Sequence, residues 1–353
     1  MSTRKTKAVI YAERNKPLFI DEISIPEPKP DQAIIKIIAS GICGSQLYDL
    51  THPKIELPRL LGHEATGIVV KKGKLVTHVE EGDHVLVSWI PYNADANTEY
   101  LKWNTVSWSG HEIKTVLFTW AEHTLLDGQF ITKMDKGFEK YTTAVLGCAG
   151  VAGYGTVRNI VNIKPGQSVV VFGAGGLGVL AVNAAKNLGA NPIIAVDIKD
   201  KKLEFSKLFG ATHTINSDTT DVVEAIKEIT NGGADFVFDM VGIPQIVEST
   251  ILAAREGVCG FCEGGTTVLV GFPKGAAEFN SRSILLGQRT YKGSRGGACI
   301  AKRDFPIFYK DYKEGALLLD QAVTNRYKLD QINEAVQDLS EGRVLGRAII
   351  EIS

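Results

Sequence analysis

Residues 169–178 read VVVFGAGGLG, and this stretch decides how the middle of the chain folds. Its first four residues are apolar, which predicts a short buried strand. Gly173, Gly175 and Gly178 follow with the spacing G-x-G-x-x-G, and Gly176 adds a further glycine. Glycine-rich turns match this spacing by chance, so its context carries the argument.

The segment after the glycines supplies that context. An apolar-periodic stretch predicts a helix that ends at Gly189, and a second predicted strand, PIIAV, ends in Asp197. Strand, glycine loop, helix and a strand ending in an acid form the dinucleotide-binding arrangement, in which the helix N-terminus faces the phosphates. A carboxylate at Asp197 accepts ribose hydroxyls and repels a 2′-phosphate, so we expect NAD rather than NADP. Lys202 also lies within reach of the ribose. The alternative is a domain of this kind that binds another nucleotide or none.

The predicted pattern of strands and helices differs before and after about residue 150. Residues 1 to about 90 read as short strands rich in Val and Ile, bounded by Pro, Gly or Asp, which predicts a twisted β-barrel. From about 150, strand and helix patterns alternate, which predicts an α/β domain with a parallel sheet. Residues 91 to about 130 are polar and aromatic and read as an inserted lobe, and the tail from about 289 is mixed.

Bulk composition excludes several classes of function. The 353 residues are 44% hydrophobic and 22% charged, with a formal net charge of −1, so no global charge recruits nucleic acid or an anionic membrane. No run reaches the ~18 apolar residues of a membrane helix, and the N-terminus lacks an apolar signal core. We therefore expect a cytoplasmic protein. Five scattered cysteines indicate free thiols or metal ligands rather than a disulfide framework.

Three residues far apart in the chain suggest a metal site. Cys43 lies in the glycine-flanked turn GICGS, His63 and Glu64 are adjacent in GHEATG, and Cys148 lies in LGCAGVAG. Two thiolates and an imidazole suit zinc, and three protein ligands leave the fourth position that a catalytic zinc keeps open. On spacing alone the bet is modest, because lone cysteines and histidines are more often packing residues than ligands.

The surrounding residues raise the metal hypothesis. The pattern G-H-E-x-x-G-x5-G-x2-V is complete over residues 62–76, and VEEGDHV follows it. With GICGS and the GAGGLG loop, the chain resembles the zinc-dependent medium-chain dehydrogenase/reductase superfamily over nearly its whole length. The resemblance implies an α/β protein with a GroES-like β-barrel catalytic domain at 1–149, a Rossmann NAD-binding domain at 150–288, and a return to the catalytic domain at 289–353.

The resemblance also implies roles for individual residues. The zinc ligands would be Cys43, His63 and Cys148, with Glu64 as the acidic neighbour and Ser45 as the hydroxyl that starts a proton relay. The cofactor would be held by Leu177 under the nicotinamide ring, by backbone at Gly271 and Phe272, and by Arg347 at a phosphate.

Three departures from the family pattern matter. Gln46 stands where relatives carry the acid that orients the ligand histidine; its carbonyl oxygen can still accept a hydrogen bond, but it brings no charge. Tyr48 stands where the relay often ends in histidine, and His52 is either an alternative shuttle or simply a surface histidine, as most such histidines are. Residues 91–130 contain no cysteine, so we expect one zinc per chain and no structural zinc.

Several further residues have less certain roles. Trp89 lies where the substrate-pocket wall should begin, and Arg295 could meet an anionic substrate or the cofactor. The aromatic lobe after Trp89 suggests a bulky or ring-shaped alcohol. Cys259 and Cys262 form a C-x-x-C that reads as a redox pair, half a metal site or, more simply, a loop with two thiols.

The expected activity is hydride transfer between NAD and a secondary alcohol, polyol, sugar or cyclitol, with zinc as Lewis acid. The alternatives are a zinc-free enone or quinone reductase of the same superfamily and a non-catalytic NAD-binding relative. The resemblance implies a homodimer or homotetramer, with a small molecule as the other partner and neither nucleic acid nor membrane.

Overall fold

The computed structural model describes residues 3–95, 98–99, 101–135 and 137–353. The chain divides into two compact units. Unit 1 comprises Met1–Cys148, Ile300–Lys310 and Leu319–Ser353, and unit 2 comprises Ala149–Cys299 and Asp311–Leu318. In the described part of the chain, no helix has both the length and the apolar character needed to cross a lipid bilayer.

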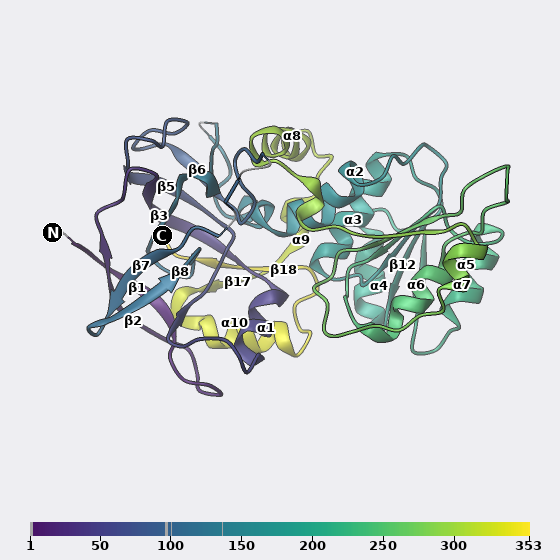
Figure 1. Ribbon diagram of the computed structural model, residues 1–353, viewed down its shortest axis with the longest axis horizontal. Coiled ribbons are helices and arrows are strands. Elements are labelled where there is room, and N and C mark those ends of the chain that lie inside the picture. The colour runs from purple at the N-terminus through teal and green to yellow at the C-terminus, as the bar shows by residue number, and fades with distance from the viewer. Residues whose placement is uncertain (1–2, 96–97, 100, 136) are drawn as a thin grey trace. The chain divides into compact units, whose positions relative to one another are not determined.

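Unit 1 contains two sheets, and most of their strands are labelled in Figure 1. The five-stranded sheet has the order β4 (Arg59–Leu60), β1 (Thr3–Tyr11), β2 (Phe19–Pro26), β7 (Asn104–Trp108) and β8 (His111–Thr115). The seven-stranded sheet has the order β10 (Ile131–Lys133), β6 (His84–Val87), β5 (Ala65–Lys72), β3 (Gln32–Ile42), β18 (Arg347–Glu351) and β17 (Val323–Lys328), with β9 (His123–Asp127) also paired to β3. This is the β-rich unit that the sequence predicts.

Strand β3 organises the seven-stranded sheet because three strands pair with it. β9 pairs with its first half and β18 with its second, both antiparallel, while β5 follows its other edge. Its residues are buried almost throughout, as expected of a strand with neighbours on both edges. The last residues of the chain therefore pair with the strand that ends just before Cys43.

Short helices connect and cover these sheets. They are α1 (Gly44–Thr51), η1 (Gly128–Phe130), η2 (Thr142–Gly147), α9 (Leu319–Ala322), η6 (Leu329–Gln331) and α10 (Ile332–Ser340), together with most of α8 (Ala301–Lys313). Leu61, Trp120, Ile332 and Ile350 belong to one buried cluster, which ties α10 to the sheets.

Unit 2 is built on six parallel strands in the order β13 (His213–Asn216), β12 (Ile193–Asp197), β11 (Val169–Phe172), β14 (Phe236–Asp239), β15 (Thr266–Leu269) and β16 (Thr290–Gly293). Residues 169–172 are fully buried, as continuous apolar runs are in parallel sheets. The strand order reverses between β11 and β14, and ligands bind at such a switch point, beyond the carboxyl ends of the strands.

The helices of unit 2 alternate with its strands (Figure 1). They are η3 (Gly150–Gly155), α2 (Thr156–Asn159), α3 (Gly176–Asn187), α4 (Asp200–Lys207), α5 (Val222–Thr230), η4 (Pro244–Ile246), α6 (Val247–Ala253), α7 (Arg282–Leu286) and η5 (Gly296–Ala298). One buried cluster joins Val170, Ile194 and Val237 of three strands to Ile226 of α5 and Ala253 of α6. The Rossmann-type α/β architecture is thus confirmed.

The boundary predicted at residues 288/289 is wrong. β16 pairs with β15 from Thr266↔Thr290 to Leu269↔Gly293 and completes the parallel sheet, so unit 2 continues to Cys299. This edge strand consists of two exposed and two partly buried residues, which left the sequence without a clear signal. Arg295 therefore belongs to unit 2, not to the return.

Residues 91–130 are not a separate lobe in the part described. The hairpin of β7 and β8 extends the five-stranded sheet beyond β2. Trp108 donates its indole N–H to Asp21 at 2.8 Å and lies against Phe19 with ring centroids 5.8 Å apart. Trp120 is buried in the core. Two of the aromatics thus stabilise the fold, and Trp103 is exposed.

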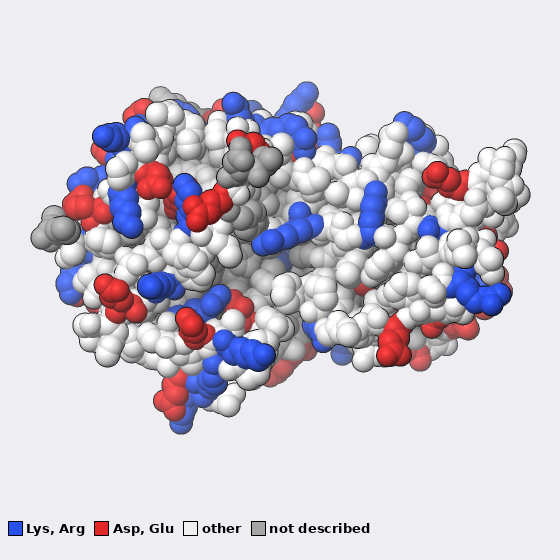
Figure 2. All heavy atoms as spheres, viewed as in Figure 1, with Lys and Arg blue, Asp and Glu red and all other residues white. Residues whose placement is uncertain are grey.

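Charged side chains are interspersed on the face that Figure 2 shows, with Lys and Arg lying among Asp and Glu. Among the described residues, some opposite charges pair directly, such as Lys5 with Glu22 at 2.7 Å and Lys71 with Glu27 at 2.5 Å. This mixture agrees with the near-zero net charge of the whole chain.

Candidate metal and dinucleotide sites

Cys43, His63 and Cys148 meet in unit 1, and we call them the ligand trio. Their ligand atoms all lie within 4.8 Å of one another, and the two sulfur atoms are 3.8 Å apart. Both cysteines are buried and His63 is partly exposed. The trio's donors are the soft nitrogen and sulfur ligands that zinc prefers.

Strand pairing brings the first two ligands together. β3 ends at Ile42 and α1 begins at Gly44, so Cys43 is the N-cap residue of α1. The N–H of Gly41 donates to the carbonyl of Glu64 at 3.1 Å, just before β5 begins, which places the residues after β3 beside those before β5. The pairing of β3 with β5 thereby brings together Cys43 and His63, which are twenty residues apart in the sequence.

Cys148 reaches the same place through η2. The preceding Gly147 packs so closely that an added Cβ would lie 3.1 Å from the Cβ of Glu64. Ser88 also donates its hydroxyl to the carbonyl of Gly147 at 2.6 Å. These contacts fix the backbone that carries the third ligand.

The two thiols influence each other's ionisation. A hydrogen bond from Cys148 lowers the pKa of Cys43, and the same bond raises the pKa of Cys148. Cys43 is therefore the thiolate that forms first. For His63, burial lowers the pKa, but the hydrogen bond and charge of Cys43 outweigh it, so the net shift is upward.

Glu64 and Arg347 form a buried ion pair beside the trio. The Arg347 guanidinium donates to the Glu64 carboxylate, and the two side chains are 4% and 0% exposed. Burial alone would lower the pKa of Arg347, but Glu64 and the two thiols raise it, so the guanidinium stays charged. We expected Arg347 to contact a cofactor phosphate; its group instead neutralises Glu64, and the phosphate contact stays a prediction.

The proposed proton-relay residues lie on α1. Ser45 is in the first turn of the helix and is partly exposed. Tyr48 and His52 face each other one helical turn apart, with ring centroids at 4.7 Å. Tyr48 and His52, the two candidates for the end of the relay, are therefore neighbours, and their roles stay predictions.

The glycine loop of unit 2 has the backbone that its sequence implies. Gly173 has φ +91°, and a Cβ there would lie 2.6 Å from Cγ2 of Val241. A Cβ on Gly178 would overlap the carbonyl oxygen of Gly173. Gly175 is the N-cap of α3, and Gly176 and Leu177 open the helix, whose first N–H groups have no partner within the helix. The start of a helix, with its unpaired N–H groups, is the kind of place where an anion binds.

Asp197 and Lys202 lie beside this loop. One Asp197 oxygen accepts from the N–H of Ala174 at 2.8 Å, and the other accepts from the N–H of Lys199 at 3.0 Å. An added Cβ on Gly175 would lie 3.7 Å from Nζ of Lys202. The acid at the end of β12 and a lysine on α4 thus flank the place where the motif predicts a dinucleotide.

Asp239 is a residue at this edge that the motif analysis missed. It ends β14 as Asp197 ends β12, and that position was the available signal. Its Oδ1 accepts from the N–H groups of Val241 and Gly242 at 2.8 and 2.9 Å, and its carbonyl accepts from Gly271 at 2.9 Å. Asp239 therefore positions the turn against which Gly173 packs.

The remaining predicted residues stay less defined. Gly271 packs tightly on Val241 and Gly242, while Phe272 is exposed, and their cofactor contacts stay predictions. Trp89 is partly buried immediately after β6, in unit 1. Arg295 is exposed in unit 2, and both pocket assignments stay predictions.

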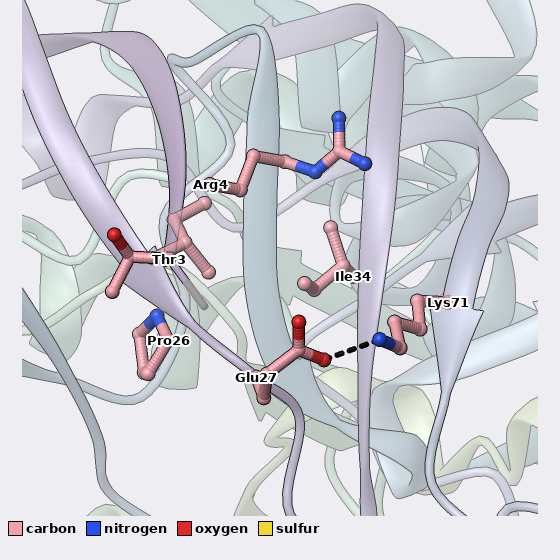
Figure 3. Close-up of a pocket in the computed structure, with 7 residues that line it drawn as sticks. Thr3, Arg4, Pro26, Glu27, Ile34 and Lys71 are labelled. Carbon is pink, nitrogen blue, oxygen red and sulfur yellow. Dashed lines mark ion pairs between the residues drawn. The ribbon is translucent and has the colours of Figure 1, made fainter. Parts of the chain in front are cut away.

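Two further features, a hollow and a pair of thiols, lie outside these two sites. The hollow in Figure 3 is lined by Thr3, Arg4, Ile25, Pro26, Glu27, Ile34 and Lys71, none of which belongs to the trio. Its Glu27 and Lys71 pair with each other. Cys259 and Cys262 lie in a hairpin before β15, where Val258 pairs with Cys262.

Two family models match the chain. Residues 29–136 match the alcohol dehydrogenase GroES-like domain, and residues 176–312 match the zinc-binding dehydrogenase domain. Alcohol dehydrogenase-like 7 of Arabidopsis thaliana is 31% identical over 97% of this chain and 94% of its own length. Putative alcohol dehydrogenase D of Mycobacterium tuberculosis is 31% identical over 98% of this chain and 100% of its own.

Solved structures give the same result. The benzyl alcohol dehydrogenase of Acinetobacter calcoaceticus has a TM-score of 0.89 at 31% identity, covering 99% of this chain and 100% of its own. The 2R,3R-butanediol dehydrogenase of Bacillus subtilis has a TM-score of 0.80 at 26% identity, covering 98% and 99%. The similarity extends over both units.

Proposed function

Because this chain belongs to the zinc-type medium-chain dehydrogenase superfamily, it is an oxidoreductase of the alcohol dehydrogenase type, and we propose that it uses one zinc and NAD to interconvert an alcohol and its carbonyl compound. The substrate class we propose is a secondary alcohol, polyol, sugar or cyclitol. The relatives named above span an aromatic alcohol and a diol, so the family by itself leaves the substrate open.

The ligand trio is the observation that carries this proposal. Two thiols and an imidazole converge within 4.8 Å, and they come from three separate segments of unit 1. His63 is the partly exposed member of the trio, and both cysteines are buried. Such a donor set fits a catalytic zinc with a fourth, exchangeable position.

The chain's own residues would divide the work as follows. When bound, zinc supplies a Lewis acid that lowers the pKa of an alcohol hydroxyl, and NAD supplies the hydride acceptor. Cys43, His63 and Cys148 hold the metal, while Arg347 neutralises Glu64 so that no uncompensated carboxylate is buried beside it. Ser45 receives the proton of the substrate hydroxyl.

The proton then needs a path outward along α1. Tyr48 can pass it through its hydroxyl, although a phenol with a pKa near ~10 is a poor base at neutral pH. His52 lies next in line, with its ring centroid 4.7 Å from that of Tyr48, and an imidazole can both accept and donate a proton. We propose that the pair acts together, with the imidazole as the final acceptor.

The NAD proposal rests on the loop of unit 2. The N–H groups at the start of α3 bind the pyrophosphate, and Asp197 accepts from the ribose hydroxyls. The cradle fits because added Cβ atoms at Gly173 and Gly178 would collide with protein atoms rather than face solvent. The backbone there is already packed to the limit that glycine allows.

The test is NADH formation, followed by absorbance, over a panel of primary alcohols, polyols, sugars and cyclitols, with zinc content measured in parallel. We expect activity on at least one class with NAD. NADH binding without turnover on any alcohol or carbonyl would favour the non-catalytic alternative, and turnover of enones or quinones by zinc-free protein would favour the reductase.

We also propose that the chain self-associates through unit 2. β16 lies at the end of the six-stranded sheet, and an edge strand is a template for pairing with an identical strand. Leu285 and Leu286, just before it, are 75% and 66% exposed. Light scattering after size exclusion should give a dimer or tetramer mass, and a monomer at micromolar concentration would contradict this.

A further inference from the structure

Gln46 touches two of the three residues of the ligand trio. It is the third residue of α1 and is 2% exposed. Its Oε1 accepts from the backbone N–H of Cys43 at 2.6 Å, and its Nε2 lies 3.3 Å from Nδ1 of His63. One buried amide thus bridges the backbone of Cys43 and the imidazole of His63.

The chemistry of the first contact fixes the second. The N–H of Cys43 can only donate, so the amide atom that faces it must be the oxygen. The amide nitrogen then faces His63, and an NH2 group can only donate. Nδ1 of His63 must therefore be the acceptor. The flipped amide is excluded because it would place NH2 against the N–H of Cys43.

This arrangement selects a histidine tautomer. A neutral imidazole that accepts at Nδ1 carries its hydrogen on Nε2, which is the nitrogen left to face a metal. Binding zinc through Nε2 requires the hydrogen on Nδ1, where it would point at the NH2 group of Gln46. Ligand histidines ordinarily donate that hydrogen to a carboxylate, a carbonyl or water. Here the Nδ1 hydrogen of His63 would face the NH2 group of Gln46, and both groups are donors.

We propose that Gln46 is a positioning residue that holds His63 in the tautomer opposed to metal binding and so keeps the zinc affinity of the trio low. This rests on the proposed zinc site, but it concerns affinity rather than turnover. A site tuned in this way exchanges its metal more readily than one with a carboxylate at position 46. The sequence alone suggested that the carbonyl oxygen of Gln46 could accept a hydrogen bond from His63. In the structure that oxygen instead accepts from the backbone N–H of Cys43.

The competing explanation is that Gln46 only caps α1. Its oxygen does satisfy the N–H of the N-cap residue Cys43, as in a capping box. Two substitutions of nearly equal shape separate these roles. Gln46→Glu keeps the cap and offers a second acceptor to Nδ1, whereas Gln46→Met removes the cap and the opposing NH2 together without adding charge.

The experiment measures zinc affinity and stability on the same three proteins. Metal is removed from each full-length chain, and Zn²⁺ is titrated back against a chromophoric chelator. The melting temperature of the metal-free protein is measured in parallel. We expect Gln46→Glu to bind zinc about 10–100-fold more tightly than wild type, the range that such partners of ligand histidines command.

The order of the variants decides between the two roles. We expect zinc affinity to fall from Gln46→Glu to Gln46→Met to wild type, while Gln46→Met has the lowest melting temperature. A pure capping role makes Gln46→Met the worst in both. Equal affinity of Gln46→Glu and wild type, or weaker binding by Gln46→Met than by wild type, overturns the inference while wild-type zinc binding upholds the proposed function. If neither wild type nor Gln46→Glu binds zinc, both fail.

Discussion

The ligand trio and the glycine loop are built in opposite ways. The trio uses side chains at positions 43, 63 and 148, which only the folded unit 1 brings within 4.8 Å. The loop uses backbone N–H groups of six consecutive residues, 173–178, whose shape follows from local glycine positions. One site depends on which side chains are present, and the other depends on which side chains are absent.

This difference teaches that the two sites should fail separately. Loss of one thiol in the trio removes a ligand but leaves unit 2 intact. A methyl group in the loop disturbs the packing of unit 2 but touches no residue of the trio. A variant of one site should therefore leave the other site unchanged, and a loss at the other site would break the comparison.

The largest effect should follow Cys148→Ala. With two ligands left, zinc content should fall from about one per chain to near zero, and turnover should fall by about a thousandfold or more, since metal polarisation contributes several kcal/mol. NADH affinity, measured by fluorescence titration, should not change. Cys262→Ala, a thiol of unit 2, is the matched control and should keep its zinc. Retained turnover and zinc in Cys148→Ala would remove this residue from the site.

A smaller effect should follow Gly173→Ala. Its φ of +91° and the Cγ2 of Val241 at 2.6 Å from an added Cβ make the substitution strained. A cost of about 1–3 kcal/mol corresponds to NADH binding weakened about 10–100-fold. Zinc content should stay at the wild-type level.

Gly166→Ala is the control for Gly173→Ala. Gly166 has φ +86° in the same unit, but a Cβ there meets no atom within 4 Å. It carries the backbone strain without the collision or the loop. Equal NADH affinities of the two variants would show that the loop packing does not set cofactor binding.

Asp197→Ala should reduce the preference between the two dinucleotides. Loss of hydrogen bonds to a charged acceptor should weaken NADH binding about tenfold, and NADPH should lose less because its 2′-phosphate no longer meets a carboxylate. Paired titrations with NADH and NADPH measure this. Tighter binding of NADPH than NADH by wild type would contradict the assignment.

The smallest effect should follow Asp239→Asn. Burial raises the pKa of Asp239, although the N–H groups of Gly242 and Val241 oppose the shift. The contribution of Asp239 to the free energy of unfolding is therefore fully present below the pKa of the unfolded state, 3.8. It is lost as the pH rises through the higher pKa of the folded state. Asn keeps an acceptor for both N–H groups without the charge.

Melting temperatures from pH 4 to 8 test this difference. We expect wild type to lose stability relative to Asp239→Asn as the pH rises, with zinc content equal in both proteins. Tyr291 titrates near Asp239: burial raises the pKa of Tyr291 most, and the charge of Asp239 raises it further. Parallel pH profiles of the two proteins would contradict a raised pKa.

The fold was largely predictable because its signals are local. Apolar runs and glycine turns predicted the parallel strands β11 and β12 and the helix α3 between them. β16 was missed because an edge strand lacks a continuous apolar run, so the boundary moved from 288/289 to Cys299. The hairpin of β7 and β8 was missed because polar and aromatic residues half-exposed on a sheet look like a loop.

The sequence by itself determined the strand, glycine loop and helix that begin unit 2, since glycine spacing and apolar runs act over neighbouring residues. It also named Cys43, His63 and Cys148 as candidates. Only the tertiary structure decided that their ligand atoms converge, that Arg347 neutralises Glu64, and that the Gln46 oxygen belongs to Cys43. The physical reason is that each of these depends on atoms brought together by strand pairing across long stretches of chain, where a side chain's partner is set by geometry and not by its position in sequence.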